Sequence, residues 1–273
     1  MGAAVVLQTH WWFFNLPTVA WWALGLSILL GLVAWKLRAA TPWAAATGTA
    51  IAATLTFSTA IFPYAPWKTV LVPLLVLLVL TSLATRVGRK RKESLGTAEA
   101  RHGRTASQVT ANLGVAALVS SELVQSALTD SGWLASSAMI PTFGFSVALA
   151  ALAESAADTV SSELGQVLGG MPRMITTLRK VEPGADGAVS IAGTLAGIAA
   201  AVLVALAGTI SLTGGSIMFW VASGGGVFGL FFDSLLGATL ERKGWLNNDA
   251  VNFLSTLSAA AFAVVLLTAI GRR

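Results

Sequence analysis

Two carboxylates lie one helical turn apart near the middle of the chain. Glu154 and Asp158 are followed by Ser161 and Gly165 at helical spacing. Residues three or four positions apart are neighbours on a helix, so these four share one face, while Glu163 points the other way. Such a pair of carboxylates is repulsive unless a proton or a cation separates it. Carboxylates combined with substrate phosphates are the usual ligands of Mg²⁺. A helix cap, or pairing with nearby arginines, is the alternative.

A second polar segment, residues 176–190, follows a few positions later. Arg179 and Lys180 bring positive charge toward the carboxylates, and Gly184 and Gly187 predict a bent segment with exposed backbone. Arginine forks match phosphate oxygens, and amides in a glycine-containing turn can cradle them. A solvated loop between helices is the alternative.

A third cluster places Asp233 on one helical face with Gly226 and Gly229. The glycines match G-x-G-x-x-G, but no strand precedes them, so the match does not indicate a dinucleotide site. Tight helix packing is the favoured use of the glycines. The last polar loop carries Asn248, with Asp249 beside it; either residue could cap the final helix instead of binding a ligand.

The composition excludes several kinds of chemistry. The 273 residues are 55% hydrophobic and 11% charged, with a mean hydropathy of +0.77, which is typical of a lipid-embedded protein. The absence of cysteine removes thiol chemistry and disulfides, and His10 and His102 alone cannot build a zinc site. The sequence contains no P-loop, G-x-S-x-G or H-E-x-x-H motif. The basic residues lack a soluble domain, so we expect no nucleic-acid partner.

We expect an all-α protein, a bundle of about eight transmembrane helices forming one integral membrane domain over residues 1–273. A bilayer core takes about 20 apolar residues per helix. The expected spans lie near 17–35, 43–62, 67–86, 109–128, 135–157, 189–212, 215–240 and 250–270. Fourteen of the seventeen basic residues then fall in the connections from odd to even spans. The positive-inside rule therefore predicts both termini outside and the polar loops in the cytoplasm, in a bacterial-type plasma membrane. The basic stretch 86–108 is expected to anchor this topology and to attract anionic membrane lipids.

Five strings resemble the integral-membrane family that includes the plant phytyl-phosphate kinase of tocopherol synthesis and the animal transmembrane protein nineteen. The resemblance covers residues 100–256, whereas residues 1–88 are less characteristic. The strings are Gln108-Val-Thr-Ala-Asn112, Ala157-Asp158-Thr-Val-Ser-Ser-Glu163-Leu-Gly165, Val181-Glu182-Pro-Gly-Ala-Asp186-Gly187-Ala-Val-Ser190, Asp233-Ser234-Leu-Leu-Gly237-Ala-Thr and Asn248-Asp249-Ala-Val-Asn252-Phe. A looser similarity extends to CTP-dependent polyprenol kinases and phosphatidate cytidylyltransferases, which carry an Asp and a downstream Gly on one helix before a Lys-x-x-Glu-Gly loop.

This resemblance implies a membrane kinase that converts an isoprenyl (phytyl-like) monophosphate to the diphosphate with Mg²⁺ and a nucleoside triphosphate, CTP being favoured. Arg179 and Lys180 would hold phosphates, and Glu182 would orient the loop. The metal ligands would be Glu154, Asp158, Asp186 and Asp233. The nucleotide contacts would be Ser161, Ser162, Gly184, Asp186, Gly187, Ser190, Asn248 and Asn252. The apolar tail would lie between spans, against the glycine face of the seventh, and the oligomeric state is open, with a homodimer as one option.

A lipid or small-anion transporter, or a flippase, is the alternative function. Such proteins place a polar site near the bilayer midplane, and Glu122 is the one clear candidate for it. We see no convincing internal repeat, and most carboxylates lie at helix ends on one side. A structural scaffold would explain the spans but not the clustered acids.

Overall fold

A computed structural model describes residues 12–98, 103–121, 140–168 and 170–271, with Val6, His10, Val124, Gln125 and Ala127. Its long helices are α2 (Pro17–Lys36), α3 (Pro42–Ser58), α4 (Leu71–Arg86), α6 (Ala106–Ser120), α8 (Ile140–Leu168), α9 (Ile191–Ser211), α10 (Ser216–Leu236) and α11 (Asn248–Gly271). Shorter elements are η1 (Pro66–Lys68), α5 (Arg89–Leu95), the π-helical turn η2 (Gly237–Glu241) and the antiparallel strands β1 (Arg173–Met174) and β2 (Ala188–Val189).

Each of the eight expected spans corresponds to one long helix, so the expectation of a helical membrane bundle is confirmed. The count of eight spans is approximate. Within the described ranges, five helices (α2, α8, α9, α10 and α11) are long and apolar enough to cross a bilayer. A sixth span arises if α4 and α5, which meet at a bend of 66°, are taken together. Helices α3 and α6 have only 17 and 15 residues, which is short for the hydrocarbon core.

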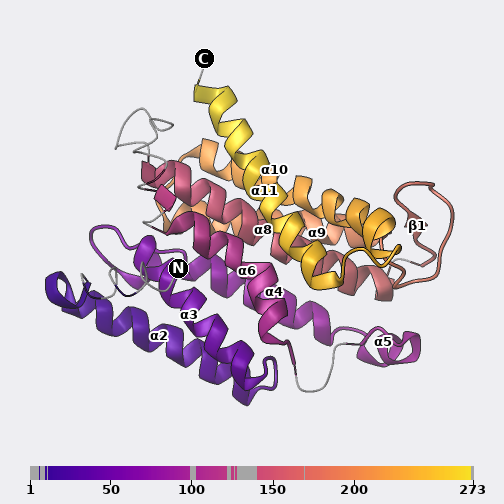
Figure 1. The fold of residues 1–273 in the computed structure, drawn as a ribbon, viewed down its shortest axis with the longest axis horizontal. Helices are drawn as coiled ribbons and strands as arrows, with labels where there is room; N and C mark the ends of the chain where they lie inside the picture. Colours follow the sequence, from indigo (N-terminus) through magenta and orange to yellow (C-terminus); the bar gives the residue numbers. More distant parts are fainter. Residues whose placement is uncertain are drawn as a thin grey trace.

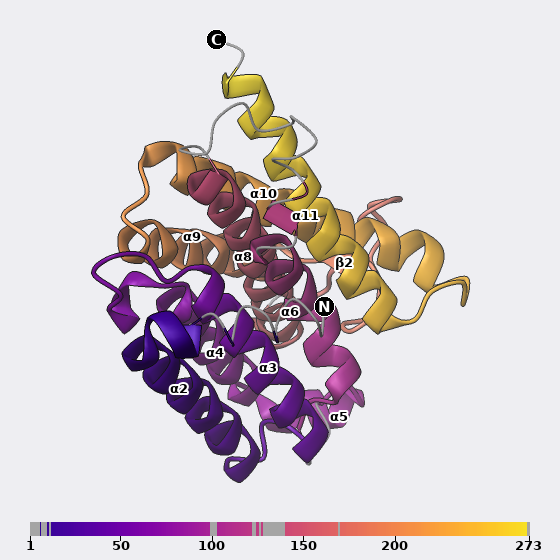
Figure 2. The same ribbon diagram turned by 60° about the vertical axis from the view of Figure 1, so that its left-hand side comes forward.

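Helix α8 lies at the centre of the bundle and contacts α4, α6, α9, α10 and α11 (Figure 1). Turning the molecule shows α2 and α3 on one side of α8 and α9 to α11 on the other (Figure 2). Its most apolar 18-residue stretch is 94% buried, against 28–39% for the other four spans. A helix that is apolar all round is expected in such a central place.

Small side chains explain why the helices around α8 approach so closely. A Cβ atom added at Gly225 would lie 2.7 Å from the Ala150 Cβ, and one at Gly226 would lie 2.8 Å from the Ala153 Cβ. At Gly229 the added atom would lie 2.9 Å from the Ala259 Cβ of α11. The predicted use of these glycines in tight packing is therefore confirmed. Because α8 and α11 fill this face, it leaves no room for an isoprenyl tail, and that expectation was wrong.

The connections expected on one side of the membrane meet at one end of the bundle. The α2–α3 connection pairs with the segment before α6, where the Thr41 amide donates to the Arg104 carbonyl at 3.0 Å. Thr97 donates to the Gln166 side chain at the end of α8, over 2.6 Å. The Arg242 guanidinium contacts the Met174 sulfur at 3.7 Å, which joins the last two connections. Polar residues far apart in the sequence are thereby brought to one surface.

Candidate functional site

A polar cavity of about 350 Å³ lies at this end of the bundle, between the ends of α8, α10 and α11 and the segment that precedes α9. Most of the residues selected from the sequence line it. They are Asp158, Ser161, Ser162, Gly184, Asp186, Gly187, Ser190, Asp233, Asn248 and Asn252. Their proposed roles remain predictions, but the structure brings together side chains from four separate stretches of sequence.

Asp158 of α8 and Asp233 of α10 form the acidic centre of the cavity. Their side chains interact directly, and Glu154 lies one turn deeper within electrostatic reach of Asp233. The Ser255 hydroxyl of α11 lies near both Glu154 and Asp233. One oxygen of Glu154 and one of Asp233 are buried without a hydrogen-bond partner. Buried carboxylate oxygens normally have partners, so this centre is suited to a ligand that supplies them.

Glycine at position 229 allows Glu154 to fit beneath this centre. A Cβ atom there would lie 2.4 Å from the Glu154 Cγ and 3.0 Å from the Ser255 carbonyl oxygen. Glu154 is 1% exposed and does not line the cavity. Of the two carboxylates predicted to act together on α8, Asp158 therefore faces the cavity and Glu154 lies behind it.

Carboxylates dominate the charge around the cavity. Among its described lining residues the acidic ones are Asp158, Glu163, Asp186, Asp233 and Glu241, and the one basic residue is Arg104. Arg104 donates to the Thr159 hydroxyl at 3.3 Å and lies within electrostatic reach of Asp158. Sequence reasoning did not assign Arg104 or Glu241 to the site. Arg104 lies just before the Gln108–Asn112 string of the family resemblance, and this position in the sequence could have identified it as a site residue.

The first turns of two helices adjoin the cavity. Ser190 caps α9, and its hydroxyl accepts from the Gly193 amide at 3.1 Å. Asn247 caps α11, because its side-chain oxygen accepts from the Ala250 amide at 2.9 Å. The cap therefore lies one residue before Asn248 and two before Asp249, the two residues expected from the sequence, and Asn248 lines the cavity. Helix N-termini carry partial positive charge and free amides, which favour anions such as phosphate.

The segment between α8 and α9 folds over the cavity as a small hydrogen-bonded lobe. Strands β1 and β2 pair, and the Ile175 amide donates to the Gly187 carbonyl at 3.1 Å. Gly187 has a φ of +73°, and a Cβ atom there would lie 2.3 Å from the Ala238 amide nitrogen of η2. Only glycine allows this approach, which brings the lobe against the π-helical turn. π-Helical turns are frequent at functional sites.

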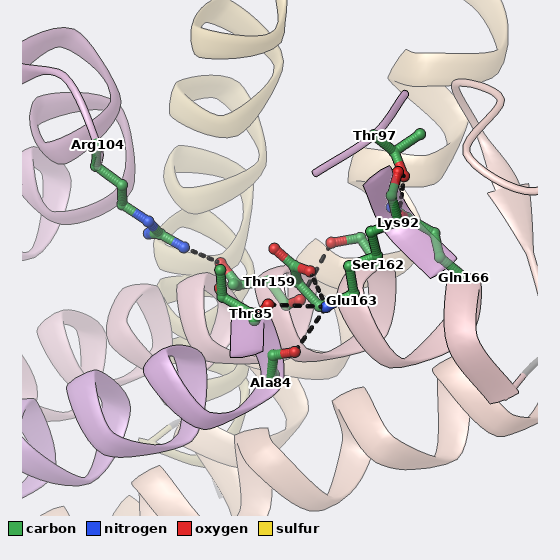
Figure 3. A network of polar contacts seen from close by, with 9 residues as sticks. All are labelled: Ala84, Thr85, Lys92, Thr97, Arg104, Thr159, Ser162, Glu163 and Gln166. Carbon is green, nitrogen blue, oxygen red and sulfur yellow. Dashed lines mark hydrogen bonds and ion pairs between the residues drawn. The ribbon is translucent and has the colours of Figure 1, made fainter. Parts of the chain in front are cut away.

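The basic stretch after α4 reaches the end of α8, where Lys92 pairs with Glu163 and Thr97 donates to Gln166 (Figure 3). Lys92 of α5 is 1% exposed, forms an ion pair with Glu163 and donates to the Ala84 and Thr85 carbonyls at 2.8 and 3.2 Å. Thr97 and Arg104, further along the same stretch, line the cavity. The stretch therefore contributes directly to the cavity wall, beyond the anchoring role expected of it.

Besides Glu154, three residues with predicted roles do not line the cavity. Arg179, Lys180 and Glu182 are exposed on the lobe, where the Arg179 carbonyl accepts from the Met174 amide at 2.9 Å. Hydrogen bonding within the lobe directs this part of the chain outward, so Arg104 is the cation at the cavity among the residues that the structure describes. Glu122, the candidate of the transporter hypothesis, lies outside the described residues.

The carboxylates at the cavity could hold a divalent cation only in an open site. In the part of the chain that the structure describes, no group of three or more His, Asp or Glu side chains is close enough to hold a metal. The four predicted ligands thus do not form one closed site: Glu154 lies behind Asp233, and Asp186 lies on the exposed lobe. Asp158 and Asp233, with an unpartnered buried oxygen, fit the open kind of Mg²⁺ site, in which one or two carboxylates share the ion with phosphates.

Fold and cavity together define a polytopic helical membrane protein with an acidic, phosphate-compatible cavity at one end. Residues 25–260 match the family described as Integral membrane protein DUF92, and the chain belongs to this family. No solved structure matches the chain.

Relatives occur in archaea, cyanobacteria and plants. An uncharacterized membrane protein of Methanocaldococcus jannaschii is 42% identical over 133 residues, covering 47% of this chain and 56% of the relative. An uncharacterized membrane protein of Synechocystis sp. is 36% identical over 204 residues, covering 72% of this chain and 73% of the relative. "Protein VTE6, chloroplastic" of Arabidopsis thaliana is 31% identical over 193 residues, covering 69% of this chain and 55% of the relative. The chain thus spans little more than half the length of the archaeal and plant proteins.

Proposed function

We propose that the protein is a membrane kinase that transfers a phosphoryl group from a nucleoside triphosphate to an isoprenyl monophosphate. The observation that carries this proposal is the Asp158–Asp233 centre, with an unpartnered buried oxygen, beside the first turns of α9 and α11. The family resemblance described above points to the same reaction.

In the proposed reaction an oxygen of the isoprenyl phosphate attacks the γ-phosphorus of the nucleotide. The bond from this phosphorus to the β–γ bridging oxygen breaks, and the nucleoside diphosphate leaves with both bonding electrons. The acceptor is already an oxyanion, so the transfer needs positioning and charge neutralisation more than a strong base. When bound, Mg²⁺ would neutralise phosphate charge. Without such a cation, the acidic wall would repel a triphosphate.

Particular residues of the chain would bind the cation and the phosphates. Asp158 and Asp233 would hold the cation, with Asp186 approaching from the lobe. Arg104 would contact phosphate oxygens, with Ser190 and Asn248 at the two helix N-termini. The amides near Gly184 and Gly187 would complete the nucleotide contacts. A cytoplasmic orientation in a bacterial-type membrane supplies the nucleotide and is part of the proposal.

The test is incubation of purified protein in detergent with a panel of isoprenyl monophosphates and four nucleoside triphosphates. Formation of the diphosphate is detected by mass, with Mg²⁺ present or chelated. We expect a Mg²⁺-dependent product with at least one pair, formed roughly 10²-fold or more slowly by an Asp158→Asn variant purified in parallel. If no pair yields diphosphate from folded protein, the kinase proposal is wrong.

The transporter alternative has less support from the geometry. The described carboxylates of the site gather at one end of the bundle, whereas transporters usually bind near the midplane. Uptake of isoprenyl phosphate or phosphate into proteoliposomes, without nucleotide and sensitive to Glu122→Gln, would favour that alternative.

A further inference from the structure

A second cavity, of about 470 Å³, adjoins the polar one. It lies among α2, α3, α4 and α6, which are outside or at the edge of the segment that carries the family strings. Much of its wall is apolar and includes Leu30, Leu74, Leu77 and Leu113, together with Gly48. Its volume falls in the range of roughly 300–1,000 Å³ that is typical of small-molecule sites.

One end of this second cavity is basic. Arg38 from the α2–α3 connection, Arg86 at the end of α4, Arg89 of α5 and Arg104 all line it. Glu93 is the acidic residue among the described lining side chains, and it pairs with Arg89 at 3.1 Å. Four guanidinium groups against one carboxylate give this end a positive field. Guanidinium groups bind phosphate oxygens in bidentate fashion.

The two cavities meet at Arg104 and Asn112, which line both. The Asn112 side chain accepts from the Ser155 hydroxyl at 3.2 Å, and Ser155 lies three residues before Asp158 on α8. The basic end of the apolar cavity therefore lies next to the carboxylate centre. A ligand with an apolar chain and a phosphate head would match this spatial order, in which the apolar wall is followed by the arginines and then by the carboxylates.

We propose that the second cavity binds the acceptor lipid, an isoprenyl monophosphate, with its chain among α2, α3, α4 and α6 and its phosphate at the arginines. This inference rests on the proposed function. It gives the N-terminal helices a role in substrate binding. It also replaces the glycine face of α10, which neighbouring helices fill, as the place of the tail.

A bulky side chain at position 48 tests the inference. A Cβ atom at Gly48 would meet only the Val109 Cγ1, at an ordinary 3.8 Å, so a larger side chain would extend into the cavity. Gly25 of α2 is exposed, lines neither cavity and has nothing within 4 Å of an added Cβ atom. Gly25→Leu is therefore the matched control for Gly48→Leu, since both changes raise helix propensity equally.

The measurement is equilibrium binding of radiolabelled geranylgeranyl monophosphate to purified protein without nucleotide. We expect Gly48→Leu to weaken binding by roughly tenfold or more, and Gly25→Leu to bind as the unmodified protein does. Arg38→Gln with Arg86→Gln should weaken binding of the phosphate but not of the corresponding alcohol. Arg91→Gln, exposed and outside both cavities, is the control for that pair.

Competition identifies the ligand class, and the kinase assay separates the two proposals. Displacement by inorganic phosphate or phosphatidylglycerol at equal concentration would overturn the assignment to an isoprenyl phosphate. If Gly48→Leu binds the lipid as tightly as the unmodified protein does, the lipid binds outside the second cavity and this inference is wrong. If the protein still forms the diphosphate in that case, the kinase proposal stands. Absence of binding would overturn this inference, and absence of product as well would overturn both.

Discussion

At the scale of single residues, the site depends on Asp158 and Asp233, which come from different helices and share the acidic centre. Conversion of either to asparagine keeps the shape of the side chain and removes its charge. We expect Asp158→Asn and Asp233→Asn each to lower nucleotide-dependent diphosphate formation by roughly 10²-fold or more, because charge neutralisation carries most of phosphoryl transfer. Initial rates at saturating Mg²⁺ measure this loss.

Asp249→Asn serves as the control for these variants. Asp249 lies in the first turn of α11 outside the cavity wall, so its loss should cost only a helix-dipole interaction of about 0.3–1 kcal/mol. Activity close to normal in Asp158→Asn or Asp233→Asn would remove that residue from the cation site.

The second prediction at this scale ranks the cations. Arg104 lines the cavity and donates to Thr159, whereas Arg179 and Lys180 are exposed on the lobe. Arg104→Gln should therefore reduce kcat/KM by roughly 10²-fold, as expected for loss of a donor to transferring phosphates. Joint replacement of Arg179 and Lys180 by alanine should cost far less. The reverse ranking would mean that the lobe turns inward during catalysis.

At the scale of elements, the glycine face of α10 sets how closely α8 and α11 approach. We expect Gly229→Ala to destabilise the protein by about 1–3 kcal/mol, because the new methyl group would overlap Glu154 and crowd the Ser255 carbonyl. Gly224→Ala on the same helix should be neutral or stabilising by up to about 1 kcal/mol. Its added Cβ atom would contact the Leu266 Cδ1 at 3.5 Å, an ordinary van der Waals distance. Reversible unfolding in mixed detergent micelles measures both changes, and equal effects would contradict this packing.

The short helix α5 holds the wall of the cavity through Lys92. Removing one partner of a buried ion pair leaves an uncompensated charge, so Lys92→Met should destabilise the protein by about 3 kcal/mol. Lys90 on the same helix is exposed, and Lys90→Met should change stability by less than about 0.5 kcal/mol. The same unfolding measurement applies. A Lys92→Met variant as stable as Lys90→Met would show that the ion pair with Glu163 contributes little.

At the scale of the whole molecule, thirteen of the fourteen described basic residues lie in or beside connections that meet at one end of the bundle. The positive-inside rule then predicts that this end faces the cytoplasm. In the cysteine-free chain, Leu95→Cys of α5 should resist an impermeant thiol reagent in intact cells. Phe62→Cys, 83% exposed between α3 and α4, should react. Labelling at position 95 without cell lysis would reverse the orientation.

The sequence by itself determined the helical membrane class, the eight helical segments and ten of the residues that line the polar cavity. Hydropathy over about 20 residues is a local property, and the family strings carry Asp158, Asp186, Asp233 and Asn252 directly. Helical spacing also predicted that Gly226 and Gly229 pack on the same face as Asp233. These features depend on neighbours within a few turns, which the sequence contains.

Only the tertiary structure decided which charged groups face the cavity. Glu154 and Asp158 share a helical face, yet packing against Gly229 leaves Glu154 behind the wall. Hydrogen bonds within the lobe direct Arg179 outward. The basic stretch after α4, which the sequence suggested to be a topology anchor, packs against α8, so that Lys92 is buried and Arg104 lies within electrostatic reach of Asp158. The apolar cavity with its arginine end arises from four helices separated in sequence. Contacts between distant segments are set by the packing of the whole bundle, and no local pattern specifies them.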